Sequence, residues 1–193
     1  DDIGGRSLDR LGIFGALDTS SFLHLASAIT RGLVHLHERR IVHKDLNPFN
    51  VIWNRSTGDV RIIDLSIASR LVAASNSIPN AGLMQGTLAY MPPEQTGRTN
   101  QSIDARSDLY SLGATLYEVL TNRLPFEATG VLELVHAHIA RLPIPPDQLD
   151  PTIPELISEI VMKLLSKRVE DRYQSARGLL ADLQACLHQL EAQ

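Results

Sequence analysis

The chain has 193 residues, 44% of them hydrophobic, which is enough for one domain with a substantial core and excludes disorder throughout. Its formal net charge of -4 leaves no basic excess, so nucleic acid is not expected as a partner. The single cysteine, Cys186, excludes an internal disulfide and any zinc site made of several cysteines.

Helical periodicity accounts for most of the chain. Apolar residues spaced i, i+3, i+4 and i+7 follow the N-cap candidates of residues 18–21, and leucines line one face of the last helix. Pro154 suits the first turn of a helix, where a backbone N–H has no partner in any case. The predicted helices run from about 22 to 39, 105 to 120, 129 to 140, 154 to 166 and 179 to 190.

One β-hairpin interrupts the helices. Residues 51–53 and 60–63 are short β-type runs, and a Ser-Thr-Gly-Asp turn lies between them. Residues 1–18 and 142–154 are expected to be irregular, and no regular element is predicted for 64–103, a length typical of a functional segment. The predicted fold class is mainly α (α+β), a helical bundle with a small β-hairpin.

The residues with catalytic potential gather in the predicted loop 43–50. Asp45 and Asn50 lie in this loop, and Asp64 follows at the end of the hairpin. One carboxylate can orient and deprotonate a hydroxyl, while an amide oxygen and a second carboxylate are hard ligands of the kind Mg²⁺ prefers. The set favours phosphoryl transfer, although a turn-capping role would be the better interpretation of Asp45 or Asn50 alone.

This loop is the first of five short motifs spread along the chain. They are His43-x-Asp45-x-x-x-x-Asn50, Asp64-Leu65-Ser66, the stretch from Gly86-Thr87 to Pro93-Glu94, the stretch from Ser107-Asp108 to Gly113, and Asp171-Arg172. In this order they resemble the catalytic loop, the DFG element, the APE end of the activation segment, the start of the large buried helix and the late DR element of protein kinases. The chain resembles the C-terminal lobe of a serine/threonine protein kinase.

The resemblance implies a single kinase-like C-lobe, with the N-lobe absent. That domain would span residues 1–193, with the catalytic loop at 43–50, the activation segment at 64–94 and a helical subdomain at 105–193. ATP and Mg²⁺ are the implied cofactors, and a protein is the implied substrate. No Gly-rich phosphate loop and no Val-Ala-Ile-Lys strand occur, so we expect an N-terminal lobe to be a partner of this chain.

The resemblance assigns five residues to catalysis or ligand binding. Asp45 would be the catalytic base, and Thr87 would contact it and shape the site for Ser or Thr. Asn50 and Asp64 would bind Mg²⁺ and, with it, the ATP phosphates. Asn47 stands at the catalytic position where serine/threonine kinases usually carry a lysine that meets the transferred phosphate, so weaker charge stabilisation is expected.

Another five residues are expected to support the site. His43 would brace the loop against the DFG-like element, and Asp108 would hold the loop backbone from below. Glu94 and Arg172 would form a buried ion pair that ties the activation segment to the helices. Lys44 replaces the usual arginine and lacks its planar fork, which argues against regulation by a phosphorylated activation loop.

Three functions compete at this point. The first is an ATP-dependent serine/threonine kinase, and the second is a pseudokinase-like interaction module or inactive fragment. The retained acids and Asn50 favour the first, whereas Asn47, the missing lobe and Ser66 in place of the DFG glycine favour the second. A small-molecule kinase of the aminoglycoside type shares the 43–50 pattern, but stretches 86–94 and 107–113 argue against it.

The wider text of the motifs is similar to the kinase domains of large bacterial hybrid proteins. In those proteins a serine/threonine kinase-like domain precedes an ATPase-like region, a GAF domain and a histidine kinase. The resemblance implies downstream sensor domains as partners. No apolar run reaches the roughly 18 residues of a membrane span and no signal peptide opens the chain, so a cytoplasmic location is expected.

Overall fold

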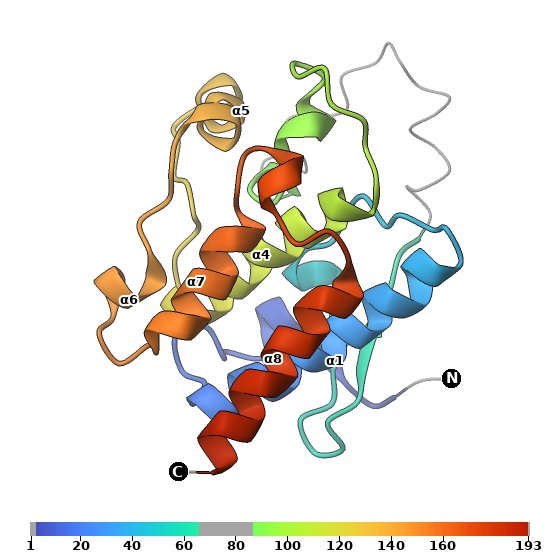
Figure 1. Ribbon diagram of the computed structural model, residues 1–193, viewed down its shortest axis with the longest axis vertical. Helices are drawn as coiled ribbons and strands as arrows, with labels where there is room; N and C mark the ends of the chain where they lie inside the picture. The colour runs from blue at the N-terminus through green and yellow to red at the C-terminus, as the bar shows by residue number, and fades with distance from the viewer. Residues whose placement is uncertain (1–2, 66–86, 193) are drawn as a thin grey trace.

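Helices dominate the residues that the computed structural model describes, which are 3–65 and 87–192 (Figure 1). The α-helices there are α1 (Thr19–Glu38), α4 (Ala105–Thr121), α5 (Val131–Ala140), α6 (Pro146–Leu149), α7 (Glu155–Leu164) and α8 (Ala176–Glu191). Short 3₁₀ helices are η1 (Leu8–Arg10), η2 (Pro48–Asn50), η3 (Pro93–Thr96) and η4 (Val169–Asp171). The predicted fold class, mainly α with a small β element, is confirmed.

A small antiparallel sheet lies at one side of the helices. Its strands, in spatial order, are β1 (Arg6–Ser7), β2 (Val51–Trp53) and β3 (Val60–Ile62). β2 and β3 are the predicted hairpin, whereas β1 falls in a segment expected to be irregular and pairs through Arg6 with Trp53. A Cβ on Gly5 would lie 2.8 Å from the Trp53 carbonyl, so this close approach requires glycine.

α4 is the central helix, and every residue from Ser107 to Tyr117 is buried. A capping box starts it, because Asp104 accepts from the Arg106 N–H at 2.8 Å while Ser107 Oγ accepts from the Asp104 N–H at 3.3 Å. α7 packs across α4 at Gly113, where an added Cβ would lie 2.7 Å from Cβ of Leu164. The helices of the domain therefore assemble around a helix with almost no exposed face.

α1 packs along α8, and the two helices run side by side in Figure 1. Asp18 caps the start of α1 by accepting from the Ser21 N–H at 2.8 Å. The apolar face of α1 is fully buried at Phe22, Ile29 and Leu33. The end of α1 leads directly into the loop that holds the predicted catalytic residues.

The element boundaries differ from the predictions by a few residues; α1 and α8, for example, begin at Thr19 and Ala176, about three residues before the predicted starts. α5 begins at Val131 instead of 129, and Pro154 precedes α7 as its N-cap instead of lying in its first turn. The short helix α6 lies within the link that was expected to be irregular. Within residues 3–65 and 87–192, none of the helices combines the length and apolarity that a bilayer crossing demands.

Candidate active site

The backbone of the 43–50 loop is hydrogen-bonded to the first turn of α4. The carboxylate of Asp108 accepts from the N–H of His43 at 2.8 Å and from the N–H of Lys44 at 2.8 Å. A third hydrogen bond joins Asp108 to Nε2 of His37 at 2.8 Å. Asp108 is fully buried, and these three donors satisfy a carboxylate that would otherwise be costly to bury. The loop therefore has a fixed position relative to the central helix.

Two amide side chains of the same loop hold the carboxylate of Asp45. Nδ2 of Asn47 donates to Oδ1 at 3.0 Å, and Nδ2 of Asn50 donates to Oδ2 at 2.9 Å. Burial raises the pKa of Asp45 above its ordinary value, against the opposing effect of the Asn50 hydrogen bond, and the nearby charge of Asp64 also raises it. A carboxylate with a raised pKa is a better proton acceptor, which suits a general base.

Asn47 is occupied entirely within the loop. Its Oδ1 accepts from the N–H groups of Phe49 and Asn50 at 3.0 and 3.2 Å, and so caps η2. Its Nδ2 donates to the carbonyl as well as to the carboxylate of Asp45, and the residue is only 2% exposed. The catalytic role expected for Asn47 is therefore less favoured than a positioning role, because its polar atoms are engaged and buried.

The imidazole of His43 joins the loop to the residue before Asp64. Its Nε2 lies 2.9 Å from the carbonyl oxygen of Ile63, which can only accept, so Nε2 is the donor. Nδ1 is then the acceptor for the N–H of Asp45 at 3.3 Å. Both ring nitrogens are engaged, so the imidazole links the loop to the residue before Asp64.

Asp64 and Asn50 offer oxygen ligands of the kind that Mg²⁺ takes. Because Nδ2 of Asn50 is bound to Asp45, Oδ1 is the atom through which Asn50 could reach a cation. An amide oxygen and one carboxylate, completed by phosphate oxygens and water, are a normal Mg²⁺ set, so these residues fit the ion. No group of three or more His, Cys, Asp or Glu suited to a metal occurs in the described part of the chain.

Residues at and just after the end of the 64–94 segment lie beside Asp45. Thr87, Gln95 and Asp45 line one small cavity of about 30 Å³. Nε2 of Gln95 also donates to the carbonyl of Lys44 at 2.8 Å. The two predicted segments therefore meet at the proposed base. Ser66 and Gly86, which belong to the predicted motifs, lie outside the described residues.

Glu94 and Arg172 form a buried ion pair, and neither side chain is exposed. Nη1 and Nη2 of Arg172 donate to the two carboxylate oxygens at 2.7 and 3.0 Å, and Oγ of Ser107 donates to Glu94 at 2.8 Å. The guanidinium also donates to three backbone carbonyls, those of Ser166, Lys167 and Arg106. The pair fixes the end of the 64–94 segment to α4 and η4.

Two residues that support the loop were missed by the sequence analysis. No motif points to His37, which bonds to Asp108 beneath the loop. Gln95 was not singled out, although it lies directly after Glu94 and binds the loop. Nothing in the sequence alone shows these contacts, because they join residues 71 and 51 positions apart.

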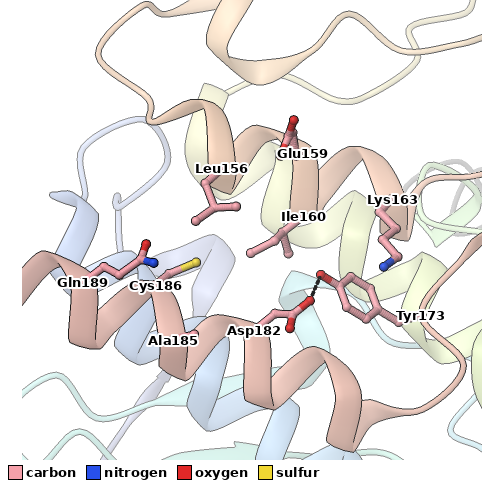
Figure 2. A pocket seen from close by; sticks show the side chains of 9 residues that line it. All are labelled: Leu156, Glu159, Ile160, Lys163, Tyr173, Asp182, Ala185, Cys186 and Gln189. Carbon is pink, nitrogen blue, oxygen red and sulfur yellow. Dashed lines mark hydrogen bonds between the residues drawn. The ribbon is translucent and has the colours of Figure 1, made fainter.

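A larger hollow of about 350 Å³ lies between α7 and α8, away from the predicted residues (Figure 2). The hydroxyl of Tyr173 donates to Asp182 at 2.8 Å within it. Cys186 also lines it, and burial raises the pKa of that thiol, which makes it a poorer nucleophile. None of the predicted site residues lines this hollow, so it is not the candidate active site.

The comparisons with known proteins agree with the geometry. The family model of the protein kinase domain matches residues 5–183. Serine/threonine-protein kinase PknB of Mycobacterium leprae is 35% identical over 169 residues, which are 88% of this chain and 26% of the relative. PknB of Mycobacterium tuberculosis is 37% identical over 147 residues, 76% of this chain and 23% of the relative.

A third relative, serine/threonine-protein kinase Pkn1 of Myxococcus xanthus, is 35% identical over 174 residues, 89% of this chain and 25% of its own length. The chain spans about a quarter of the length of these curated relatives. The family match, by contrast, covers most of the chain and includes the 43–50 loop, Glu94 and Arg172. The chain therefore belongs to the protein kinase domain family.

Proposed function

We propose that this chain is the catalytic C-terminal lobe of a protein serine/threonine kinase, which transfers the γ-phosphoryl group of ATP to a Ser or Thr of a protein. The observation that carries this proposal is the arrangement of Asp45. Its carboxylate has a raised pKa, is held by two amides and lies in a loop fixed to Asp108. The relatives named above are serine/threonine-protein kinases by name, which supports the same activity.

In the proposed reaction, the oxygen of the substrate hydroxyl attacks the γ-phosphorus, and the Asp45 carboxylate accepts the proton of that hydroxyl. The bond from that phosphorus to the β–γ bridging oxygen breaks, and ADP leaves. Mg²⁺, when bound, neutralises charge on the phosphates, and Asn50 and Asp64 would hold it. Thr87, in the cavity beside Asp45, would shape the site for a Ser or Thr hydroxyl.

We further propose that an N-terminal lobe completes the ATP site. Three large apolar side chains on and beside the loop and the hairpin remain exposed: Phe49 at 50%, Ile63 at 41% and Leu65 at 42%. Exposed apolar side chains near catalytic groups suit a second lobe that covers ATP. The similarity of the motif sequences to those of bacterial hybrid kinases supports a bacterial signalling protein with downstream sensor domains as the wider setting.

The alternative is a pseudokinase-like interaction module or inactive fragment. It is favoured by Asn47, because no lysine at that position meets the transferred phosphate, and the Asn47 side chain is buried in the loop. To separate the two, the chain is joined behind a PknB-type N-terminal lobe and incubated with Mg²⁺, ATP and mixed protein substrates. Transfer to Ser or Thr supports the kinase, whereas ATP binding without transfer supports the alternative.

A further inference from the structure

The backbone of Lys44 is fixed from two sides. Its N–H donates to Asp108 at 2.8 Å, and its carbonyl accepts from Nε2 of Gln95 at 2.8 Å. Asp108 lies in α4 and Gln95 in η3, so two separate elements hold one residue of the loop. Lys44 has a φ of +67°, a left-handed conformation that a residue with a side chain keeps only where its surroundings enforce it.

The carbonyl that Gln95 binds lies in the peptide plane that leads into Asp45. Because a peptide bond is planar, fixing the C=O of Lys44 also fixes the direction of the Asp45 N–H. That N–H donates to Nδ1 of His43 at 3.3 Å, so the plane is held at both edges. This plane ends at the Cα of Asp45, so it helps to set the point from which Asp45 extends its carboxylate toward Asn47 and Asn50.

The ion pair next to Gln95 in the chain fixes the position of its backbone. Gln95 follows Glu94, which Arg172 binds with both terminal nitrogens, and it lies in the short helix η3. Its own N–H donates to the Pro92 carbonyl at 3.0 Å. Gln95 and Asp45 also line the same cavity of about 30 Å³.

We propose that Gln95 is a positioning residue for Asp45. Its amide holds the Lys44–Asp45 peptide, and because Gln95 follows Glu94, the Glu94–Arg172 pair thereby helps to fix the backbone of the catalytic loop. The inference rests on the proposed function only for the role of Asp45 as base. The effect of Gln95 on the loop backbone does not depend on it. The two parts are therefore tested separately.

The first test measures hydrogen exchange of the Lys44 and Asp45 amides in the 193-residue chain. Gln95→Met removes the donor at similar length, Gln95→Lys restores a donor, and Gln148→Met alters an exposed glutamine of α6 as the matched control. Both N–H groups keep their own partners in Gln95→Met, but the peptide between them loses its hold on the carbonyl side. We therefore expect these amides to open more often and to exchange roughly tenfold faster in Gln95→Met, and near the wild-type rate in the other two. Amides of α4 should not change.

The second test measures kinetics with the chain joined to an N-terminal kinase lobe. Gln95→Met should lower kcat by roughly ten- to a hundredfold through misplacement of the base, with KM for ATP unchanged and partial recovery in Gln95→Lys. Unchanged amide exchange in Gln95→Met overturns the proposal, and so does a kcat equal to that of Gln148→Met. Absence of any transfer by the wild type would refute the proposed function, while the exchange result still decides the role of Gln95.

Discussion

Arg172 and Glu94 meet in a buried, bidentate ion pair although 78 positions separate them in the sequence. Both side chains are fully buried, and Ser107 and three backbone carbonyls complete their hydrogen bonding. The pair joins η3, at the end of the 64–94 segment, to the turn after η4. It therefore stabilises the elements that carry Gln95 as well as the helical core.

Glu94→Gln should destabilise the chain by about 3–5 kcal/mol, because it leaves the buried guanidinium without its counter-charge. Denaturant unfolding of the 193-residue chain measures this loss. The matched control is Glu170→Gln, which removes the partner of Arg168 in a pair that is 75% and 62% exposed, and it should cost about 1 kcal/mol or less. Equal losses in the two variants would contradict the structural role of the buried pair.

His138 should make the fold sensitive to acid. Burial, with the nearby charge of Lys167, lowers the pKa of His138 from 6.5 to about 4, and Nδ1 of His138 is hydrogen-bonded to the Tyr110 hydroxyl at 2.9 Å. The unfolded chain binds this proton below about pH 6.5 but the folded chain only below about pH 4, so acid favours unfolding. The contribution of neutral His138 to the free energy of unfolding is therefore complete above about pH 6.5 and is lost as the pH falls to about 4.

The expected loss over that range is on the order of 3 kcal/mol from this one histidine. It is measured as the free energy of unfolding of the wild type and of His138→Phe from pH 4 to 7. Phe keeps an aromatic ring next to Phe126 and Tyr110, whose rings pack edge-on against His138. The difference in free energy of unfolding between the wild type and His138→Phe should change with pH in this window. If the two plots of unfolding free energy against pH run parallel, His138 does not titrate as described.

The sequence predicted the long helices and the hairpin because their apolar spacing is local, whereas the elements it missed depend on distant partners. β1 is two residues long and exists because β2 offers an edge to Arg6 and Ser7. For the site, the motif positions led us to expect that Asp108 holds the backbone of the loop that contains His43, and that Glu94 pairs with Arg172. They did not show that Asn47 is buried, because burial depends on packing that no motif records.

Asp108→Asn should loosen the loop, since an amide keeps only one acceptor oxygen for three donors and turns its own N–H₂ toward one of them. We expect a loss of about 2–3 kcal/mol in stability and faster exchange of the His43 and Lys44 amides. Asp171→Asn, at an exposed position of η4, is the control and should leave both unchanged. Wild-type exchange at these amides in Asp108→Asn would refute the anchoring role.

The 193-residue chain alone should bind ATP more weakly than micromolar and should not transfer phosphate. It offers a base and two oxygen ligands for Mg²⁺ but carries no Gly-rich loop or Val-Ala-Ile-Lys strand to hold the phosphates. Positioning supplies most of the catalysis in phosphoryl transfer, so Asp45 cannot replace those groups. Calorimetry with Mg²⁺ and ATP checks this, and micromolar affinity would show that the chain is self-sufficient.

The role of Asp45 as base is tested most directly by phosphoryl transfer in the chain joined to an N-terminal kinase lobe. Mg²⁺, ATP and mixed protein substrates are supplied, and the phosphorylated residues are identified. We expect phosphoserine or phosphothreonine from the wild type and from Asp171→Asn, and a kcat roughly a hundredfold lower, or lower still, for Asp45→Asn. Phosphotyrosine as the main product would refute the Ser/Thr specificity, and full activity in Asp45→Asn would refute Asp45 as the base.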